Sequence, residues 1–256
     1  MSKTPLRIIS RLDVKSNNVI KGVHLEGLRV IGDPNILALN YYNSGVDEII
    51  YMDVVASLYG RNNIFNVVKK AAQDIFVPLT VGGGIRKIDD IIIALRHGAD
   101  KVAINTQALK DPGFLSLASK VFGNQCIVLS IEAKNRGDNK WEALTDNGRE
   151  KTGVDVLDWV KEAVKLGVGE ILLTSVDKEG TKSGFDLNLI DQVSSRVNIP
   201  VIACGGVGTI NHIEELLIKT DINAICCASI FHYNKYSVND LKKNLDKLNF
   251  NVRLDY

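Results

Sequence analysis

The chain has 256 residues, of which 45% are hydrophobic and 24% are charged. Its 31 basic side chains nearly balance its 30 acidic ones, and the formal net charge of +1 argues against a protein that binds nucleic acid over a broad surface. No run reaches the roughly 18 apolar residues of a membrane span. The first ten residues lack the apolar core of a signal peptide. We therefore expect a soluble, cytoplasmic protein.

Eight short apolar runs, rich in isoleucine, valine and leucine, alternate along the chain with amphipathic stretches. Such runs are typical of parallel strands covered on both faces. In chain order we predict strands over residues 6–14, 48–54, 78–81, 101–105, 126–133, 170–175, 200–203 and 224–231, and helices over 64–74, 88–97, 112–122, 154–166 and 187–197. Gly98, Gly123 and Gly167 follow three of these helices and predict their C-terminal ends.

Landmarks of the first half of the chain recur in the second half. Residues 51–53 match 175–177, residues 78–84 match 200–206, and residues 102–105 match 226–229. The first and fifth strands align as well, which places Asp13 opposite Glu132. Two similar four-stranded halves close naturally into a ring. We therefore predict an α/β fold, one (β/α)8 TIM barrel over residues 1–256, as a single domain with an internal twofold half-barrel repeat.

Two connections, 15–33 and 135–152, are longer than usual, and each follows the first strand of its half. They should cover the same mouth of the barrel, and long loops in a compact domain are often functional lids. The four cysteines have no C-x-x-C spacing. We expect buried, reduced thiols that pack as small hydrophobic groups, and neither a metal nor another cofactor.

Asp13 and Glu132 stand at the C-terminal ends of their strands, where the active sites of such barrels lie. Two carboxylates that face each other suit acid–base chemistry, one giving a proton while the other takes one. The alternative for either residue alone is a loop cap or a pair with a nearby lysine. The symmetric placement favours catalysis.

Glycine clusters end one strand in each half, at 82–84 and at 205–206, and each precedes a helix start. Bare backbone amides at a helix N-terminus can hold a phosphate. One strand later come the small or polar pairs Asn105-Thr106 and Ala228-Ser229. A single cluster would be explained by a tight turn. Two symmetric clusters predict two phosphate cups and an elongated substrate with a phosphate at each end.

Each of four charged residues, Arg7, Glu48, Lys101 and Glu170, comes just before the apolar run of a strand, at the opposite end of the barrel, and their signs alternate along the chain. From their spacing alone we expect them to be solvated on the outer rim. If they point inward instead they must pair, because a lone buried charge is costly.

Specific motifs over nearly the whole chain resemble the cyclase subunit of imidazole glycerol phosphate synthase. They are 7–9, 12–15, 21–23, 32–34, 78–86, 98–102, 169–175, Asp177, 180–184, 205–206, 228–232 and 252–254. The resemblance implies a glutaminase partner on the N-terminal face that releases ammonia, and the charged ring of Arg7, Glu48, Lys101 and Glu170 as its gate. At the far mouth, ammonia would convert a bisphosphorylated ribulosyl-formimino aminoimidazole carboxamide ribotide into imidazole glycerol phosphate and aminoimidazole carboxamide ribotide.

The resemblance also implies roles for individual residues. Asp13 matches a catalytic acid–base, Glu132 stands in the place of the second acid, and Lys21 matches a functional lysine of the mobile first loop. The candidate substrate- and phosphate-binding residues are Arg11, Thr80, Gly83, Gly84, Asn105, Thr106, Thr174, Asp177, Gly180, Gly205, Gly206, Ala228 and Ser229.

Three positions depart from the family pattern. Arg11 replaces a cysteine, Glu132 replaces an aspartate one methylene shorter, and Ala103 replaces a serine. A catalytic group misplaced by about 1 Å can cost on the order of 100-fold in rate. Arg11 and Glu132 together are a candidate coupled pair across the barrel, suited to a different substrate.

Three functions remain open on the sequence. The first is the histidine-pathway cyclase, which the retained phosphate cups favour. The second is a paralogue that channels glutaminase ammonia into an acetamidino group on a surface-polysaccharide sugar, which the changed acids favour. The third is a non-catalytic barrel that only binds a glutaminase.

Overall fold

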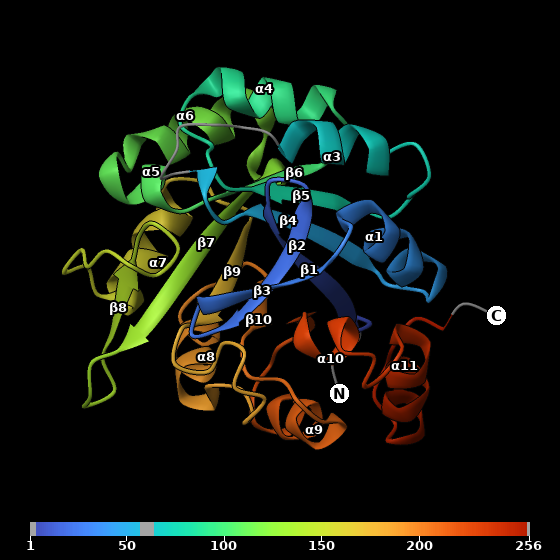
Figure 1. Cartoon of the computed structure of the whole chain (residues 1–256). Coiled ribbons are helices and arrows are strands. Elements are labelled where there is room, and N and C mark those ends of the chain that lie inside the picture. The colour runs from blue at the N-terminus through green and yellow to red at the C-terminus, as the bar shows by residue number, and fades with distance from the viewer. Residues whose placement is uncertain (1–3, 57–63, 255–256) are drawn as a thin grey trace.

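The computed structural model describes residues 4–56 and 64–254. Eight parallel strands form a closed barrel (Figure 1), which confirms the predicted (β/α)8 fold. They are β1 (Arg7–Lys15), β4 (Glu48–Asp53), β5 (Leu79–Gly82), β6 (Lys101–Ile104), β7 (Ile127–Asn135), β9 (Glu170–Ser175), β10 (Val201–Cys204) and β11 (Ala224–Cys227). Each strand pairs with the next, and β11 closes the ring against β1 from Arg7 opposite Ala224 to Ser10 opposite Cys227.

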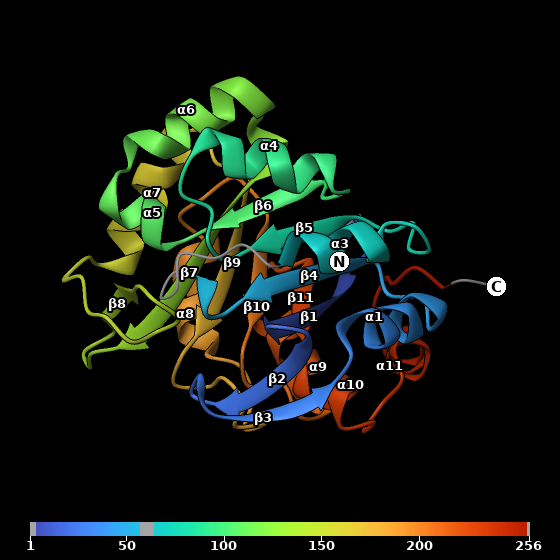
Figure 2. The ribbon, with the colours of Figure 1, turned by 45° about the horizontal axis from the view of Figure 1, so that its top comes forward.

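Helices surround the barrel and connect its strands (Figure 2). They are α1 (Pro34–Asn43), α3 (Ile64–Ala71), α4 (Ile88–Arg96), α5 (Thr106–Lys110), α6 (Gly113–Phe122), α7 (Val156–Lys165), α8 (Leu187–Ser194), α9 (Ile210–Lys219), α10 (Ser229–His232) and α11 (Val238–Lys247). No helix in the described parts of the chain is long and apolar enough to cross a membrane.

The predicted elements differ from the observed ones mainly at their ends. The strand predicted to run to residue 231 is wrong beyond Cys227, because the chain turns there into the short helix α10. Helix α7 begins at Val156, two residues later than predicted, because the Asp155 carboxylate caps the amides of Leu157 and Asp158. Gly98, Gly123 and Gly167 all have positive φ angles, as the predicted helix ends require.

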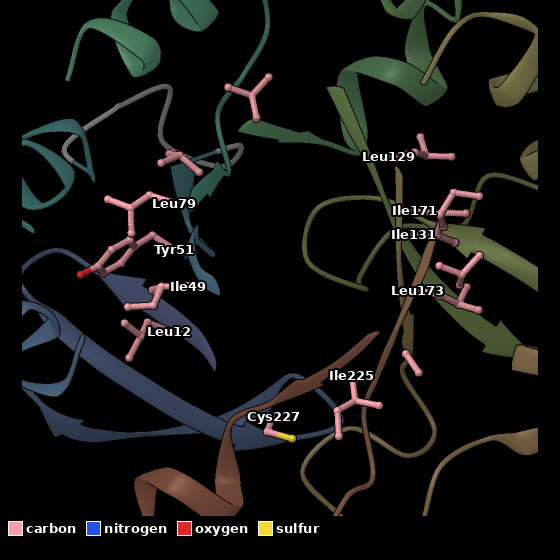
Figure 3. Close-up of a cluster of buried hydrophobic side chains, with 14 of the residues drawn as sticks. Leu12, Ile49, Tyr51, Leu79, Leu129, Ile131, Ile171, Leu173, Ile225 and Cys227 are labelled. Carbon is pink, nitrogen blue, oxygen red and sulfur yellow. The ribbon is translucent and has the colours of Figure 1, made fainter. Parts of the chain in front are cut away.

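Side chains alternate along each strand between two layers of the core. The outer layer fills the space between barrel and helices, and Figure 3 shows part of it, including Leu12, Tyr51 and Ile171. The inner layer fills the barrel with apolar side chains such as Ile9 and Leu172. Because the side chains of a strand alternate between its faces, Arg11 and Asp13 share the inner face of β1 with Ile9.

The two long connections contain antiparallel strands that extend the barrel wall. Within 15–33, β2 (Asn18–Val23) and β3 (Glu26–Gly32) form a hairpin beside the C-terminal end of β1. Its turn docks on the loop after β9, where the His24 amide donates to the Glu179 carbonyl at 2.8 Å. Within 135–152, β8 (Trp141–Leu144) pairs back along β7. Both connections therefore lie at the same mouth of the barrel.

Candidate active site at the C-terminal mouth

Asp13 and Glu132 are both buried, at 6% and 7% exposure, near the C-terminal ends of β1 and β7. Their environments differ although their positions are related by the internal repeat. Each carboxyl has its own set of hydrogen-bond donors and its own shift in pKa. The pair is therefore not two equivalent acids.

Asp13 is held by a cation from its own strand. The Arg11 Nε donates to Asp13 Oδ1 at 2.7 Å, and Arg11 Nη1 donates to Thr174 Oγ1 at 3.0 Å and contacts Cys204 Sγ at 3.8 Å. The expected pairing of Arg11 with Glu132 across the barrel is therefore wrong. Asp13 lies two residues away on the same inner face of β1, so it is within reach of the guanidinium.

The charge of Asp13 follows from this contact. Burial by itself would raise the pKa of Asp13, but Arg11 and then Lys21 lower it below its ordinary value. Arg11 stays charged, since its burial is outweighed by the carboxylate and its pKa is raised. Asp13 is thus an ionised group at neutral pH, able to stabilise positive charge that develops nearby.

Glu132 is poised to exchange a proton near neutral pH. Its Oε2 accepts from Asn105 Nδ2 at 3.0 Å and from the Gly148 amide at 2.7 Å. Burial raises its pKa from 4.5 to about 7, against the opposing effect of Arg11. A carboxyl whose pKa lies close to the working pH suits general acid–base catalysis.

Lys21 projects from β2 of the hairpin into the same mouth and is 3% exposed. It pairs with Glu179 from the loop after β9, and its Nζ lies 3.9 Å from Asp13 Oδ2. Burial lowers the pKa of Lys21. Glu179 was not among the candidate residues, although it directly precedes the Gly180-Thr181 motif.

The first glycine cluster lies at a cavity of about 130 Å³. Gly83, Gly84, Asn105 and Thr106 line it as predicted, together with Glu132. Other lining residues were not predicted as contacts, among them Arg86, Lys110, Ala103 and Asn147. The two basic side chains favour an anion at this first cup.

The second glycine cluster lines a smaller cavity with the predicted residues Gly180, Gly205, Gly206, Ala228 and Ser229. At Gly206 a Cβ would stand 2.0 Å from the Gly184 carbonyl oxygen, so close packing also requires glycine there. A larger adjoining groove of about 590 Å³ is lined by Lys21, Arg29, Lys182 and Ser229, among others. The basic side chains give this second cup an anion-attracting rim as well.

Besides Arg11, three candidate substrate-binding residues lie outside the two cups. Thr80 is buried in the barrel wall, beside Lys101 in the strand register and below the mouth. Thr174 holds the Arg11 guanidinium. Asp177 lies in the loop after β9. It pairs with Lys134 and accepts a hydrogen bond from the Asn135 amide at 2.7 Å, so its carboxylate holds this loop against the end of β7.

His232, the last residue of α10, is a further buried group near the mouth and had no predicted role. The Nδ1 of His232 shares a hydrogen bond of 2.7 Å with the Tyr41 hydroxyl. Burial lowers its pKa to about 4, so the imidazole is neutral at physiological pH. The described residues contain no cluster of three or more His, Cys, Asp or Glu placed to hold a metal ion.

At the opposite mouth, four charges form a closed ring. Arg7 donates to Glu48 and to Glu170 at 2.6 Å each, and Lys101 Nζ donates to the same two carboxylates at 2.9 Å each. The side chains are 26% exposed or less. The expectation of four solvated charges is therefore wrong, because alternate signs point inward and satisfy one another.

Comparison with known proteins agrees with this architecture. Residues 7–237 match the family model described as histidine biosynthesis protein. The chain belongs to this family. Among its relatives is an imidazole glycerol phosphate synthase subunit HisF of Legionella pneumophila, 62% identical over 203 residues, which are 79% of this chain and 96% of the relative. Subunits of the same name from Bacillus cereus strains AH187 and Q1 are each 46% identical over 248 residues, or 97% of this chain and 98% of the relative.

Membership of the histidine biosynthesis protein family confirms the resemblance read from the sequence motifs. The match covers the strands that carry Asp13, Glu132, both glycine clusters and the charged ring. The mouth of this family member thus combines two anion-attracting cups with an ionised aspartate and a glutamate that titrates near neutral pH.

Proposed function

We propose that this chain is the cyclase subunit of an imidazole glycerol phosphate synthase-type complex in histidine biosynthesis. It uses ammonia to convert a bisphosphorylated ribulosyl-formimino aminoimidazole carboxamide ribotide into imidazole glycerol phosphate and aminoimidazole carboxamide ribotide. The single observation that carries the proposal is the placement of two glycine-lined cups around one buried pair of carboxyl groups. The names of the relatives support it.

The two acids have separate tasks in this proposal. Glu132, with a pKa of about 7, gives and takes the protons that ammonia addition and ring closure require. Asp13, held ionised by Arg11, stabilises the positive charge that develops on the attacking nitrogen. Lys21 closes the hairpin over the bound substrate through its contacts to Glu179 and Asp13.

A glutaminase subunit is the proposed partner, on the N-terminal face. The ring of Arg7, Glu48, Lys101 and Glu170 supports this placement, since it closes the end of the barrel opposite the two cups. A shallow cavity of about 660 Å³ borders the ring there and is lined by three of its members. Rearrangement of the ring pairs would open a way for ammonia into the barrel.

Turnover by the purified chain tests the proposal. With ammonium as the nitrogen source and the bisphosphorylated ribotide as substrate, imidazole glycerol phosphate should form without the glutaminase. Asp13→Asn and Glu132→Gln should each lose at least about 100-fold of this rate. In the complex with the glutaminase, undiminished product formation by Asp13→Asn would instead support a barrel that only binds its partner. Absence of product from a wild-type chain that binds the ribotide overturns the proposal.

A second candidate is the paralogue that supplies ammonia for an acetamidino sugar, and one observation favours it. The Arg11 side chain is buried beside the mouth and pairs with Asp13, which limits the room there and the part that Asp13 can take in proton transfer. Under this candidate the wild-type chain fails on the ribotide, and Arg11→Cys with Glu132→Asp gains turnover. Under the leading proposal the wild type is active and the double variant has no such gain.

A further inference from the structure

The turn after β8 forms one wall of the first cup, and hydrogen bonds hold it on both sides of Asn147. On one side the Asp146 amide donates to Thr106 Oγ1 at 3.2 Å. On the other the Gly148 amide donates to Glu132 Oε2 at 2.7 Å. The position of Asn147 is therefore fixed relative to both the cup and the carboxyl that titrates near neutral pH.

Asn147 itself has an unused donor at this place. It is 9% exposed and lines the first cup, yet its buried Nδ2 has no acceptor among the described residues 4–56 and 64–254. A buried donor without a partner costs about 1–3 kcal/mol. Nothing in the folding of the turn requires this amide, since the backbone groups on either side make the contacts that fix it.

The charged groups around Asn147 restrict which kind of acceptor can bind its Nδ2 donor. Glu132 accepts from the amide of the next residue, Gly148, and lines the same cavity, and Asp146 precedes Asn147 in the chain; both are acidic. An anionic oxygen beside them would be repelled, whereas the phosphate has its own place at Gly83 and Gly84 near Arg86 and Lys110. The acceptor that fits Asn147 is thus a neutral oxygen, of a carbonyl or hydroxyl group, between the phosphate and the reacting atoms.

We propose that Asn147 is a specificity-determining residue that donates an Nδ2 hydrogen bond to a neutral carbonyl or hydroxyl oxygen of the substrate held in the first cup. The substrate identity rests on the proposed function. The Nδ2 group of Asn147 is already in place in the free protein and has no acceptor in the part of the chain that the structure describes, so the ligand oxygen would supply the missing acceptor. A ligand lacking this oxygen leaves the amide buried and unpaired and binds more weakly.

Two substitutions distinguish the effect of the Asn147 side-chain amide from the effect of its backbone conformation. Asn147 has a left-handed φ of 60°, which glycine adopts freely and aspartate tolerates. Asn147→Gly removes the amide and keeps the turn. Asn147→Asp keeps the shape but replaces the donor by an acceptor. Asn249→Gly is the matched control, because Asn249 has a φ of 62°, is exposed just beyond the end of α11, and is not among the residues that line the cup.

The measurements are the KM and kcat for the bisphosphorylated ribotide with saturating ammonium, and the Kd of the aminoimidazole carboxamide ribotide by calorimetry. We expect KM and Kd to rise on the order of 10-fold in Asn147→Gly and 100-fold in Asn147→Asp, with the larger share of the loss in KM. The control should match the wild type. The melting temperature of free Asn147→Gly should not fall, whereas a purely structural asparagine would lower it.

The outcomes distinguish this inference from the function on which it rests. Unchanged KM and Kd in both Asn147 variants overturn the role of Asn147 while wild-type turnover stands. A wild type that binds the carboxamide ribotide without turnover overturns the proposed function. In that case the Kd values of the wild type and the Asn147 variants still test whether Asn147 binds the ligand. A wild type that binds neither ribotide overturns both.

Discussion

Arg11 and Asp13, two positions apart on β1, form an ion pair inside the barrel, with 2.7 Å between Nε and Oδ1. Their side chains are only 3% and 8% exposed. The pair makes Asp13 a fixed negative charge and leaves Glu132, across the mouth, as the group that titrates near neutral pH. The repeat related the two acids by symmetry, and this one contact makes them different.

Removing Arg11 should destabilise the fold unless Asp13 is changed with it. Arg11→Met leaves a buried carboxylate without its cation, which typically costs about 3–5 kcal/mol. Arg11→Met with Asp13→Asn should recover most of this loss, because no uncompensated charge remains. Urea denaturation of the two single variants and the double variant measures the coupling. Additive effects would contradict the ion pair.

The raised pKa of Glu132 predicts a pH-dependent gain in stability for Glu132→Gln. Below about pH 4.5 the carboxyl is protonated in the folded and unfolded states alike, so its ionisation does not change the free energy of unfolding. Between 4.5 and about 7 the folded state binds the extra proton, and wild-type stability falls as pH rises. Above pH 7 the cost is complete, about 3 kcal/mol at 1.36 kcal/mol per pKa unit. Glu132→Gln should therefore unfold at higher urea than the wild type at pH 8 and at equal urea at pH 4.

The titration of Glu132 should also be seen in the pH dependence of the reaction rate. If Glu132 transfers protons, the pH profile of kcat/KM with ammonium has an inflection near pH 7, after correction for the fraction of free ammonia. Arg11 lowers the pKa of Glu132, so Arg11→Met should move the inflection to higher pH. An inflection that persists in Glu132→Gln would assign it to another group.

The charged ring should contribute to stability as a unit. Glu48→Gln weakens the contacts of both Arg7 and Lys101, and we expect a loss of about 1–3 kcal/mol in the free energy of unfolding. Glu215→Gln is the matched control, since its pair with Lys219 at 2.8 Å is exposed and contributes little. Equal effects of the two substitutions in thermal denaturation would argue against a cooperative ring.

Lys21 should hold the hairpin of β2 and β3 over the mouth. Lys21→Met removes its pairs with Glu179 and Asp13, so the hairpin amides should exchange with solvent at least about tenfold faster. Lys15→Met removes an exposed cation at the end of β1 and serves as control. Hydrogen-exchange mass spectrometry of the hairpin peptides measures both. Unchanged protection in Lys21→Met would show that backbone contacts such as His24 to Glu179 suffice.

Much of the barrel could be predicted from local patterns. Continuous apolar runs mark strands buried on both faces, and the strand over 170–175 was predicted to the residue. The sequence predicts only a long loop over 15–33, because β3 of the hairpin is mostly exposed and contains no buried apolar residue. The glycines and small residues of the two cups could also be predicted, because they stand in short motifs at strand ends, but the basic lining residues Arg86 and Lys110 could not.

The sequence by itself determined the eight strands, their closure into two related halves, and the positions of Asp13, Glu132 and the glycine clusters. These follow from periodicity and repetition, which are properties of neighbouring residues. Only the tertiary structure decided which charges meet: Arg11 with Asp13 instead of Glu132, Lys21 with Glu179, and the ring pairs at the other mouth. Several side chains compete for each partner inside the barrel, and most of them come from strands far apart in the chain, so their distances are known only once the barrel has closed. The burial that results also sets the pKa that gives Glu132 its proposed role.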